Sequence, residues 1–226
     1  MNSITLAVLD MAGTTVSDDG VVEQAFADAY DATSVLRGFG SRDSVREYAR
    51  ATMGQSKIQV FTELTGTHEE ALEANVAFEA AFAALVAGGA CTPIPGAAQT
   101  MVRLREAGIA VVLTTGFSRG TQNALLDSLG WHDIIDLSLC PADAGRGRPF
   151  PDLNLTARIR TETLGVSDML VAGDTSTDML SGTRSGAAFV VGVLTGAHDE
   201  SVLRAAGASD VLASVADLPA LLGLDD

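Results

Sequence analysis

The sequence contains little positive charge: 14 lysine and arginine residues stand against 29 aspartate and glutamate residues in a chain of 226 residues. The formal net charge is -15. A nucleic-acid-binding protein needs a basic surface, so this balance argues against that class. An anionic membrane surface would repel the chain for the same reason. Lysine is the scarcest charged residue, with a single copy at Lys57.

Cysteine and histidine are also scarce. The cysteines are Cys91 and Cys140, and the histidines are His68, His132 and His198. Their positions match neither the spacing of zinc ligands nor a disulfide framework, and they do not indicate a histidine-based catalytic triad. The low cysteine content fits a reducing environment, so we expect a cytoplasmic protein.

Long apolar runs are missing too. The longest stretch without a charged residue covers residues 80–102, and its glycines and prolines would break a membrane-spanning helix. Residues 1–9 lack the basic start of a signal peptide. We therefore expect no membrane segment. The hydrophobic content of 47% is enough for a sizeable folded core.

Short apolar runs alternate with amphipathic segments along most of the chain. The apolar runs predict buried strands at residues 4–9, 111–115, 133–139, 169–174 and 188–193. The amphipathic segments predict helices at residues 96–107, 119–129, 153–164 and 177–185. This alternation predicts an α/β, Rossmann-like fold in which helices cover both faces of a parallel sheet.

The interval between the first two predicted strands is too long for a single crossover. Its periodicity predicts helices at residues 22–36, 41–52, 57–65 and 69–87. We therefore predict an α/β core domain of residues 1–16 and 94–226, with a helical domain of residues 17–93 inserted after the first strand. The two chain crossings between these domains are a candidate hinge.

Three aspartates follow the carboxyl ends of predicted strands, where parallel sheets bind ligands. Asp10 ends the first strand, Asp174 ends the fourth, and Asp178 lies one helical turn further on. Crowded carboxylates raise one another's pKa, and a hard divalent cation such as Mg²⁺ removes that conflict. For any one aspartate, helix capping is an equally good interpretation. The set of three favours a metal site that can also clamp a phosphate.

Two further strand ends carry groups that suit a phosphate. Thr114, Thr115 and Gly116 follow the second strand and offer hydroxyl groups and an open backbone N–H. Arg148 lies in a loop after the third strand and offers a cation. Taken alone, each of these segments is only a turn signal.

In their order along the chain, these segments resemble the motifs of the haloacid-dehalogenase-like (HAD) hydrolase superfamily. Residues 10–15, DMAGTT, resemble the first motif, and residues 173–178, GDTSTD, resemble the fourth, metal-binding motif. Thr115 matches the hydroxyl of the second motif, with Thr114 as the competing assignment, and Arg148 matches the cation of the third. The resemblance covers nearly the whole chain, and the inserted helices resemble the small helical cap of that superfamily.

The resemblance implies a hydrolase that works through an aspartyl-phosphate intermediate on Asp10. It implies that Mg²⁺ is held by Asp10, the carbonyl of Ala12 and Asp174, and that Asp178 orients water bound to the metal. Thr115 is then expected to bind phosphoryl oxygens together with the arginine of the third motif. Family members often form dimers through the cap, so a homodimer is a further expectation.

One departure points to a particular branch. Most phosphatases of the superfamily carry a second aspartate two residues after the nucleophile, where it protonates the leaving group, and here that residue is Ala12. The phosphonatase branch, phosphonoacetaldehyde hydrolase, has the same alanine. Its lysine segment resembles residues 53–58, in which Met53 and Gly54 match and Lys57 falls on the Schiff-base position. The predicted substrate contacts are Met53, Gly54, Gly116 and Thr114, and Lys57 belongs to the predicted catalytic residues with Asp10, Thr115 and Arg148.

Other departures leave the substrate open. Val60 stands where phosphonatases carry a histidine for proton transfer, and Val21 stands near the position of their cap cysteine. Two functions are therefore kept: a phosphonatase with Lys57 as Schiff base, and a phosphomonoesterase on a small phosphorylated metabolite with Lys57 only binding substrate. A dehalogenase and a non-catalytic phosphoacceptor module are weaker alternatives. Lys57 as an ordinary, solvated helix-start lysine is the simplest interpretation of that residue.

Overall fold

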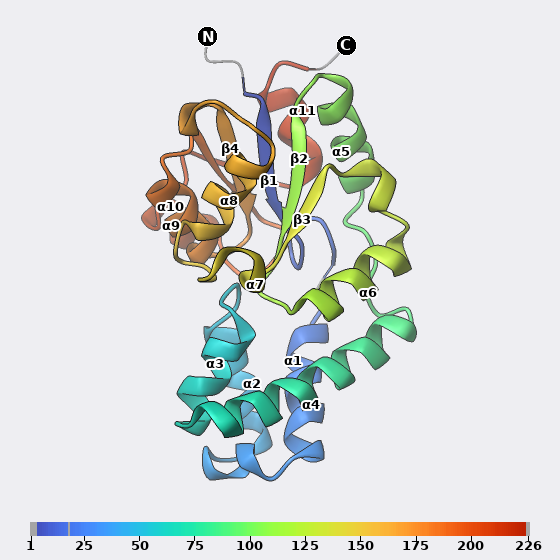
Figure 1. The fold of residues 1–226 in the computed structure, drawn as a ribbon, viewed down its shortest axis with the longest axis vertical. Coiled ribbons are helices and arrows are strands. Elements are labelled where there is room, and N and C mark those ends of the chain that lie inside the picture. Colours follow the sequence, from blue (N-terminus) through green and yellow to red (C-terminus); the bar gives the residue numbers. More distant parts are fainter. Residues whose placement is uncertain (1–3, 18, 225–226) are drawn as a thin grey trace.

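A parallel sheet forms the centre of the computed structural model, which describes residues 4–17 and 19–224. The six strands have the order β3-β2-β1-β4-β5-β6. Their bounds are β1 (Leu6–Asp10), β2 (Ala110–Thr114), β3 (Leu137–Leu139), β4 (Met169–Gly173), β5 (Phe189–Val193) and β6 (Asp210–Leu212). Every pairing is parallel, so all carboxyl ends lie at one edge, which faces the lower helices in Figure 1.

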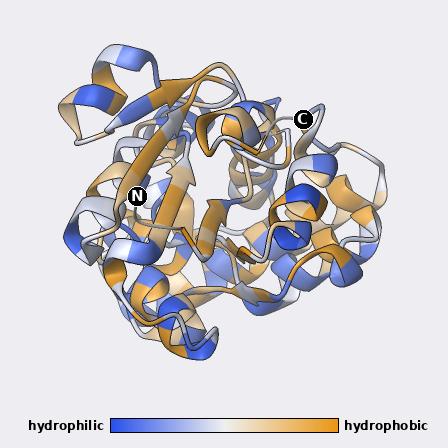
Figure 2. Cartoon of the chain, turned by 90° about the horizontal axis from the view of Figure 1, so that it is seen from above, coloured by the Kyte–Doolittle hydropathy of each residue, from blue (hydrophilic) through white to orange (hydrophobic). Residues whose placement is uncertain are grey.

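Helices cover both faces of this sheet, as the alternation of strands and helices predicts. Along β1, Leu6 and Val8 pack with α8 on one face, while Ala7 and Leu9 belong to the cluster of the other face. The first face carries α7 (Pro141–Ala144), α8 (Asp152–Arg160), α9 (Ser176–Ser185) and α10 (Glu200–Ala205). The second carries α5 (Ala97–Glu106), α6 (Arg119–Leu129) and α11 (Leu218–Leu221). The apolar strands therefore lie between amphipathic helices (Figure 2), and the predicted α/β fold is confirmed.

A helical unit is inserted between β1 and α5 and lies beyond the carboxyl ends of the strands (Figure 1). It contains α1 (Val21–Ala32), α2 (Arg42–Ala51), α3 (Lys57–Thr65) and α4 (His68–Ala87). Its interior is aromatic: the ring of Phe26 lies 4.8 Å from that of Phe61 and 4.9 Å from that of Phe78. Offset and tilted ring pairs at this separation add to the stabilisation that burial alone supplies.

The two chain segments that enter and leave the helical unit lie side by side. The backbone N–H of Ser17 donates to the carbonyl of Thr92 at 2.8 Å, and that of Ile94 donates to Thr15 at 2.9 Å. We propose residues 16/17 and 93/94 as the boundaries between the core and the helical unit, because the chain passes between them at this short antiparallel pair.

Three predicted elements are shorter in the structure: two helices end early and one strand begins late. The helix predicted at 22–36 stops at Ala32, because Thr33 is extended, and a separate 3₁₀ turn (Val35–Gly38) follows. The strand predicted at 133–139 shrinks to β3, since His132–Ile134 forms a 3₁₀ turn. The helix predicted at 153–164 ends at Arg160. Local turns decide these ends, and apolar periodicity does not detect them.

Three elements near the C-terminal end lie outside the predictions, namely α10, β6 and α11. All three are short, and the edge strand β6 is only partly buried and lacks the apolar run that marks the other strands. Within residues 4–17 and 19–224, no helix is both long enough and apolar enough to cross a membrane.

The aromatic interior of the helical unit makes a stability prediction. Phe78 is 1% exposed, so Phe78→Ala should lower the free energy of unfolding by about 3–5 kcal/mol through lost burial and a residual cavity. Val76 lies on the same helix but is 66% exposed, so Val76→Ala should change it by less than about 0.5 kcal/mol. Urea denaturation followed by circular dichroism measures both, and equal losses would contradict the packing described.

Candidate active site

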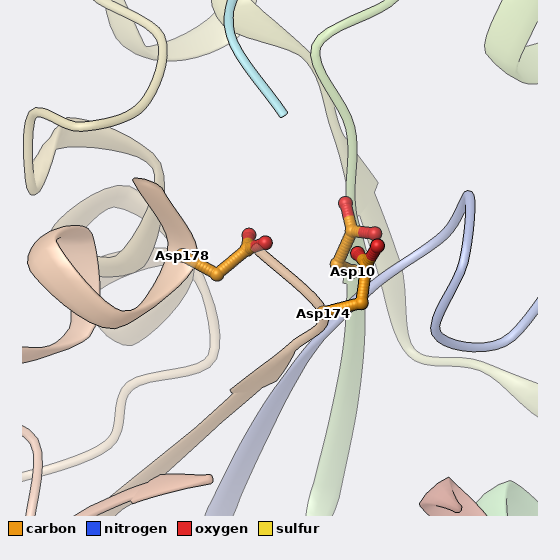
Figure 3. Close-up of side chains that lie close together, drawn as sticks. All are labelled: Asp10, Asp174 and Asp178. Atoms are coloured by element: carbon orange, nitrogen blue, oxygen red, sulfur yellow. The ribbon is translucent and has the colours of Figure 1, made fainter. Parts of the chain in front are cut away.

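The three aspartates meet at the carboxyl edge of the sheet. Asp10 is the last residue of β1, Asp174 directly follows β4, and Asp178 lies in the first turn of α9. One carboxylate oxygen from each lies within 4.8 Å of the others, and all three side chains are buried. Figure 3 shows Asp10 and Asp174 side by side, with Asp178 pointing toward them from the helix.

Burial and mutual repulsion make this cluster electrostatically costly. Burial raises the pKa of Asp10 to about 7, with Arg148 opposing the shift and the charge of Asp178 adding to it. Burial likewise raises the pKa of Asp174 well above its ordinary value, and the charges of Asp10 and Asp178 raise it further. A cation between the carboxylates would offset this cost, and an all-oxygen donor set suits a hard divalent ion. The residues present therefore fit a metal site.

Arg148 already supplies part of that positive charge. Its Nη1 donates to Oδ1 of Asp10 at 2.5 Å and also to Oδ1 of Asp178. Burial lowers the pKa of Arg148, but the charges of Asp10 and Asp178 outweigh it and hold the pKa above the ordinary value. Among the described residues, the buried Nε of Arg148 has no hydrogen-bond partner. A buried N–H of this kind is a ready donor to a phosphoryl oxygen.

The two threonines after β2 differ in their surroundings. The hydroxyl of Thr114 is directed to the carbonyl of Leu9, at 3.5 Å. Thr115 lines a small cavity beside Asp10, where its Oγ1 accepts the N–H of Phe117 at 3.2 Å. Of the two, Thr115 is placed to contact a group bound at Asp10, and Thr114 is not among the residues that line the cavity.

That cavity lies between the sheet edge and the helical unit, and its volume is about 30 Å³. The residues that line it are Asp10, Ala12, Val22, Met53, Gly54, Gln55, Lys57, Thr115, Gly116, Phe117, Arg148, Asp174 and Thr175. A space of this size holds on the order of one or two water molecules. In this arrangement the cavity is too small to hold a metabolite of several heavy atoms.

Two glycines allow the helical unit to approach the sheet this closely. A Cβ on Gly116 would lie less than 3.0 Å from the carbonyl oxygen of Gln55, which belongs to the loop before α3. A Cβ on Gly54 would come as close to the hydroxyls of Thr175 and Thr177, and its φ of +79° also favours glycine. Gly54 and Gly116, predicted as substrate contacts, thus stand where the two parts of the chain touch.

Lys57 begins α3 and is 5% exposed. Its Nζ lies 5.7 Å from the ring centre of Phe26 and 5.6 Å from that of Phe117, and its backbone N–H donates to Gly116 at 3.2 Å. Phe117 comes from the loop after β2, and its ring packs 4.6 Å from Phe82 of α4. The lysine side chain is thus buried between one ring of the helical unit and one of the core, and a solvated helix-start lysine does not describe it.

The two valines that depart from the phosphonatase pattern do not line the cavity. Val60 is fully buried among the apolar side chains of the helical unit. From α1, the valine that reaches the cavity is Val22, whereas Val21 is not among its lining residues. The histidine expected from the phosphonatase pattern therefore has no substitute on this turn of α3.

The comparison with known proteins can now be added to this geometry. Residues 4–186 match the family of haloacid dehalogenase-like hydrolases. The chain belongs to this family. As a haloacid dehalogenase-like hydrolase it is an enzyme, and its buried aspartates form a group able to hold a divalent metal ion.

Two relatives and one solved structure illustrate the similarity. The chain is 28% identical to a phosphonoacetaldehyde hydrolase of Parabacteroides distasonis, over 58% of this chain and only 58% of that protein. It is 27% identical to a phosphonoacetaldehyde hydrolase of Bacteroides fragilis, over 99% of this chain and 97% of the relative. A crystal structure of a hydrolase from Pseudomonas syringae matches with a TM-score of 0.84 and 25% identity, covering 97% and 98% of the two chains.

Several cavity residues of this HAD-like hydrolase carry no sequence signal of their own. Gln55 and Phe117 neighbour the predicted Gly54 and Gly116, so extending each motif by one residue would have found them. Phe26 does not line the cavity; it lies beside Nζ of Lys57 from within a predicted helix, and only packing identifies it. The loop at residues 195–198 contacts Asp174 and was not predicted, although its position after the fifth predicted strand, at the ligand-binding edge of the sheet, was an available signal.

The contact at Gly116 makes a prediction about closure. In Gly116→Ala the new Cβ should push residues 53–57 away from the sheet, so the amide of Lys57 should exchange with deuterium faster. Gly120→Ala is the control, since its Cβ would meet nothing closer than 3.8 Å. Hydrogen–deuterium exchange of peptides covering residues 52–58 measures the effect. Unchanged exchange in Gly116→Ala would show that the contact does not hold the helical unit.

Proposed function

We propose that this HAD-like hydrolase is a Mg²⁺-dependent, phosphonatase-like enzyme that releases phosphate from a small metabolite through an aspartyl-phosphate on Asp10. The substrate that we propose is phosphonoacetaldehyde, with Lys57 as the Schiff base. The observation that carries the proposal is that Lys57 and Asp10 line the same small cavity. The names of the curated relatives give it further support.

Lys57 would act first on the aldehyde carbon. Its neutral amine adds to that carbon, one proton is taken up from solvent, and water leaves, which forms an iminium ion. The Asp10 carboxylate then attacks phosphorus, the C–P bond breaks, and its electron pair moves into the iminium to give an enamine. Protonation and hydrolysis of the enamine release acetaldehyde, and attack of water on the aspartyl-phosphate releases phosphate and restores Asp10.

The surrounding groups would hold the phosphoryl group during these steps. Arg148 and Thr115 are placed to donate hydrogen bonds to its oxygens. Asp178 accepts from Arg148 and from the N–H of Thr175, so it orients the arginine. A Mg²⁺ ion held by Asp10, the carbonyl of Ala12 and Asp174 would neutralise charge between the phosphoryl group and the carboxylates.

The ionisable side chains of the cavity support the C–P reaction. Among the described residues that line it, these are Asp10, Lys57, Arg148 and Asp174. Two of them are the proposed nucleophile and metal ligand, and the arginine does not give up its proton. Ala12 and the apolar Val22 supply no acid. Apart from Lys57 itself, these lining residues offer an alkoxide leaving group no general acid, a contribution commonly worth about 10²–10⁴-fold in rate, whereas an iminium electron sink needs none.

The alternative is a phosphomonoesterase in which Lys57 only binds substrate. The observation that favours it is the position of Nζ over the rings of Phe26 and Phe117, because aromatic faces attract the charged ammonium form. An ammonium ion binds an anionic group but does not condense with an aldehyde. The two functions therefore differ in whether Lys57 forms a covalent bond.

Borohydride trapping separates them. With phosphonoacetaldehyde and borohydride, the wild type should gain one reduced adduct that peptide mass spectrometry places on Lys57. Lys57→Arg keeps the charge but forms no imine, so C–P hydrolysis should fall by at least about 10³-fold, comparable to the loss of a catalytic group. In Lys57→Arg/Gln59→Lys, which moves the amine to an exposed site, activity should stay lost. Undiminished C–P cleavage by Lys57→Arg, or release of phosphate only from esters, would overturn the phosphonatase assignment.

Metal dependence makes a separate prediction. Mg²⁺ should raise the Tm of the wild type progressively with its concentration, and Asp174→Asn should abolish that rise. Without Mg²⁺, Asp174→Asn should be at least as stable as the wild type near neutral pH, because the pKa of this buried carboxyl is raised and its ionisation opposes folding. Asp133→Asn, at an exposed site, is the control. An undiminished Mg²⁺ effect in Asp174→Asn would place the metal elsewhere.

A further inference from the structure

A loop that belongs to no predicted motif lies against the proposed metal ligand Asp174. It comprises residues 195–198 and follows β5 at the carboxyl edge of the sheet. The N–H of Ala197 donates to Oδ2 of Asp174 at 2.7 Å, and the N–H of His198 donates to the carbonyl of Asp174 at 3.3 Å. The loop therefore contacts both the side chain and the backbone of this aspartate.

Two glycines allow the surrounding chain to reach the carboxylate. A Cβ on Gly196 or on Gly13 would lie less than 3.0 Å from Oδ2 of Asp174. The hydroxyl of Thr195 donates to the carbonyl of Gly13 at 2.7 Å, which joins the loop to the segment that follows Asp10. The carboxylate of Asp174 thus lies between two backbone segments that are bonded to each other.

The imidazole of His198 connects the loop to the start of helix α9. Its Nδ1 accepts the backbone N–H of Ser176 at 2.8 Å, and Ser176 is the first residue of α9. This bond requires Nδ1 to be unprotonated. His198 thereby joins the loop to the helix that also carries Asp178.

We propose that His198 is a positioning residue for the metal site: by bonding to Ser176 it holds residues 195–198 on Asp174 and so fixes the orientation of that carboxylate. The inference rests on the proposed metal site. Gly196 and Ala197 are exposed, so little apolar packing holds the loop in place. The hydrogen bonds of Thr195 and His198 to neighbouring segments are therefore its main anchors.

The hydrogen bond can be removed from either partner. His198→Ala removes the acceptor. Ser176→Pro removes the donor at the first helical position, where proline is well tolerated, and the preceding Thr175 is already extended, as a residue before proline prefers. His198→Asn keeps an acceptor oxygen near the place of Nδ1. His132→Ala is the control, because the exposed His132 imidazole hydrogen-bonds Asp127, which is not part of the metal site.

The dissociation constant of Mg²⁺, measured by calorimetry and checked against the rise of Tm with Mg²⁺ concentration, is the readout. We expect His198→Ala and Ser176→Pro to raise it about 10- to 100-fold, the usual effect of losing a partner that orients a metal ligand. His198→Asn should restore it to within about threefold, and His132→Ala should leave it unchanged. The metal-free Tm of all four variants should stay near that of the wild type.

Three results would overturn the inference. In the first, His198→Ala and Ser176→Pro bind Mg²⁺ as the wild type does. In the second, both lose metal-free Tm while affinity is retained, which assigns His198 a purely structural role. In the third, Asp174→Asn also binds Mg²⁺ normally, and then the proposed metal site has failed together with the role of His198. If Asp174→Asn loses Mg²⁺ binding while His198→Ala and Ser176→Pro keep it, only the positioning role of His198 is refuted.

Discussion

The burial of three carboxylates at one edge of a parallel sheet is the constraint on which the rest of the structure depends. Folding brings Asp10, Asp174 and Asp178 together, and like charges held in a poorly solvated site oppose one another. Arg148 and the backbone N–H of Ala197 offset part of that repulsion. A divalent cation bound between the carboxylates would neutralise the remaining negative charge. The arrangement that costs stability is thus the one that suits a metal ion.

The helical unit contributes what the sheet edge lacks, an amine in apolar surroundings. Phe26 comes from the unit and Phe117 from the core, and Lys57 lies between them. The aromatic interior of the unit extends through Phe82 to Phe117. Because the two rings belong to different parts of the chain, the environment of the amine forms only when the unit rests on the sheet. Closure of the unit on the sheet and enclosure of the Lys57 amine between the two rings would therefore occur together.

Much of the fold and most of the polar site could be predicted from the sequence, because both follow from periodicity. Buried parallel strands are apolar throughout, so their ends are visible, and Asp10 and Asp174 stand at two of those ends. The short edge strand β6 has no such run, and the 3₁₀ turn at His132–Ile134 interrupts a segment that is apolar enough for a strand. Phe117 and the loop at residues 195–198 act through tertiary contacts, so their identity alone gave no signal. The choice between Thr114 and Thr115 likewise needed three-dimensional placement.

The paired segments at Ser17–Thr92 and Thr15–Ile94 have a mechanical consequence. Two strands joined by hydrogen bonds resist sliding past each other but bend together about a common axis. A helical unit joined to the core through such a pair can bend about one axis, whereas two separate, unpaired connections would permit motion about several axes. The hydroxyl of Thr15 also donates to the carbonyl of Asp10 at 2.9 Å, so the axis of any such bending is fixed relative to that aspartate.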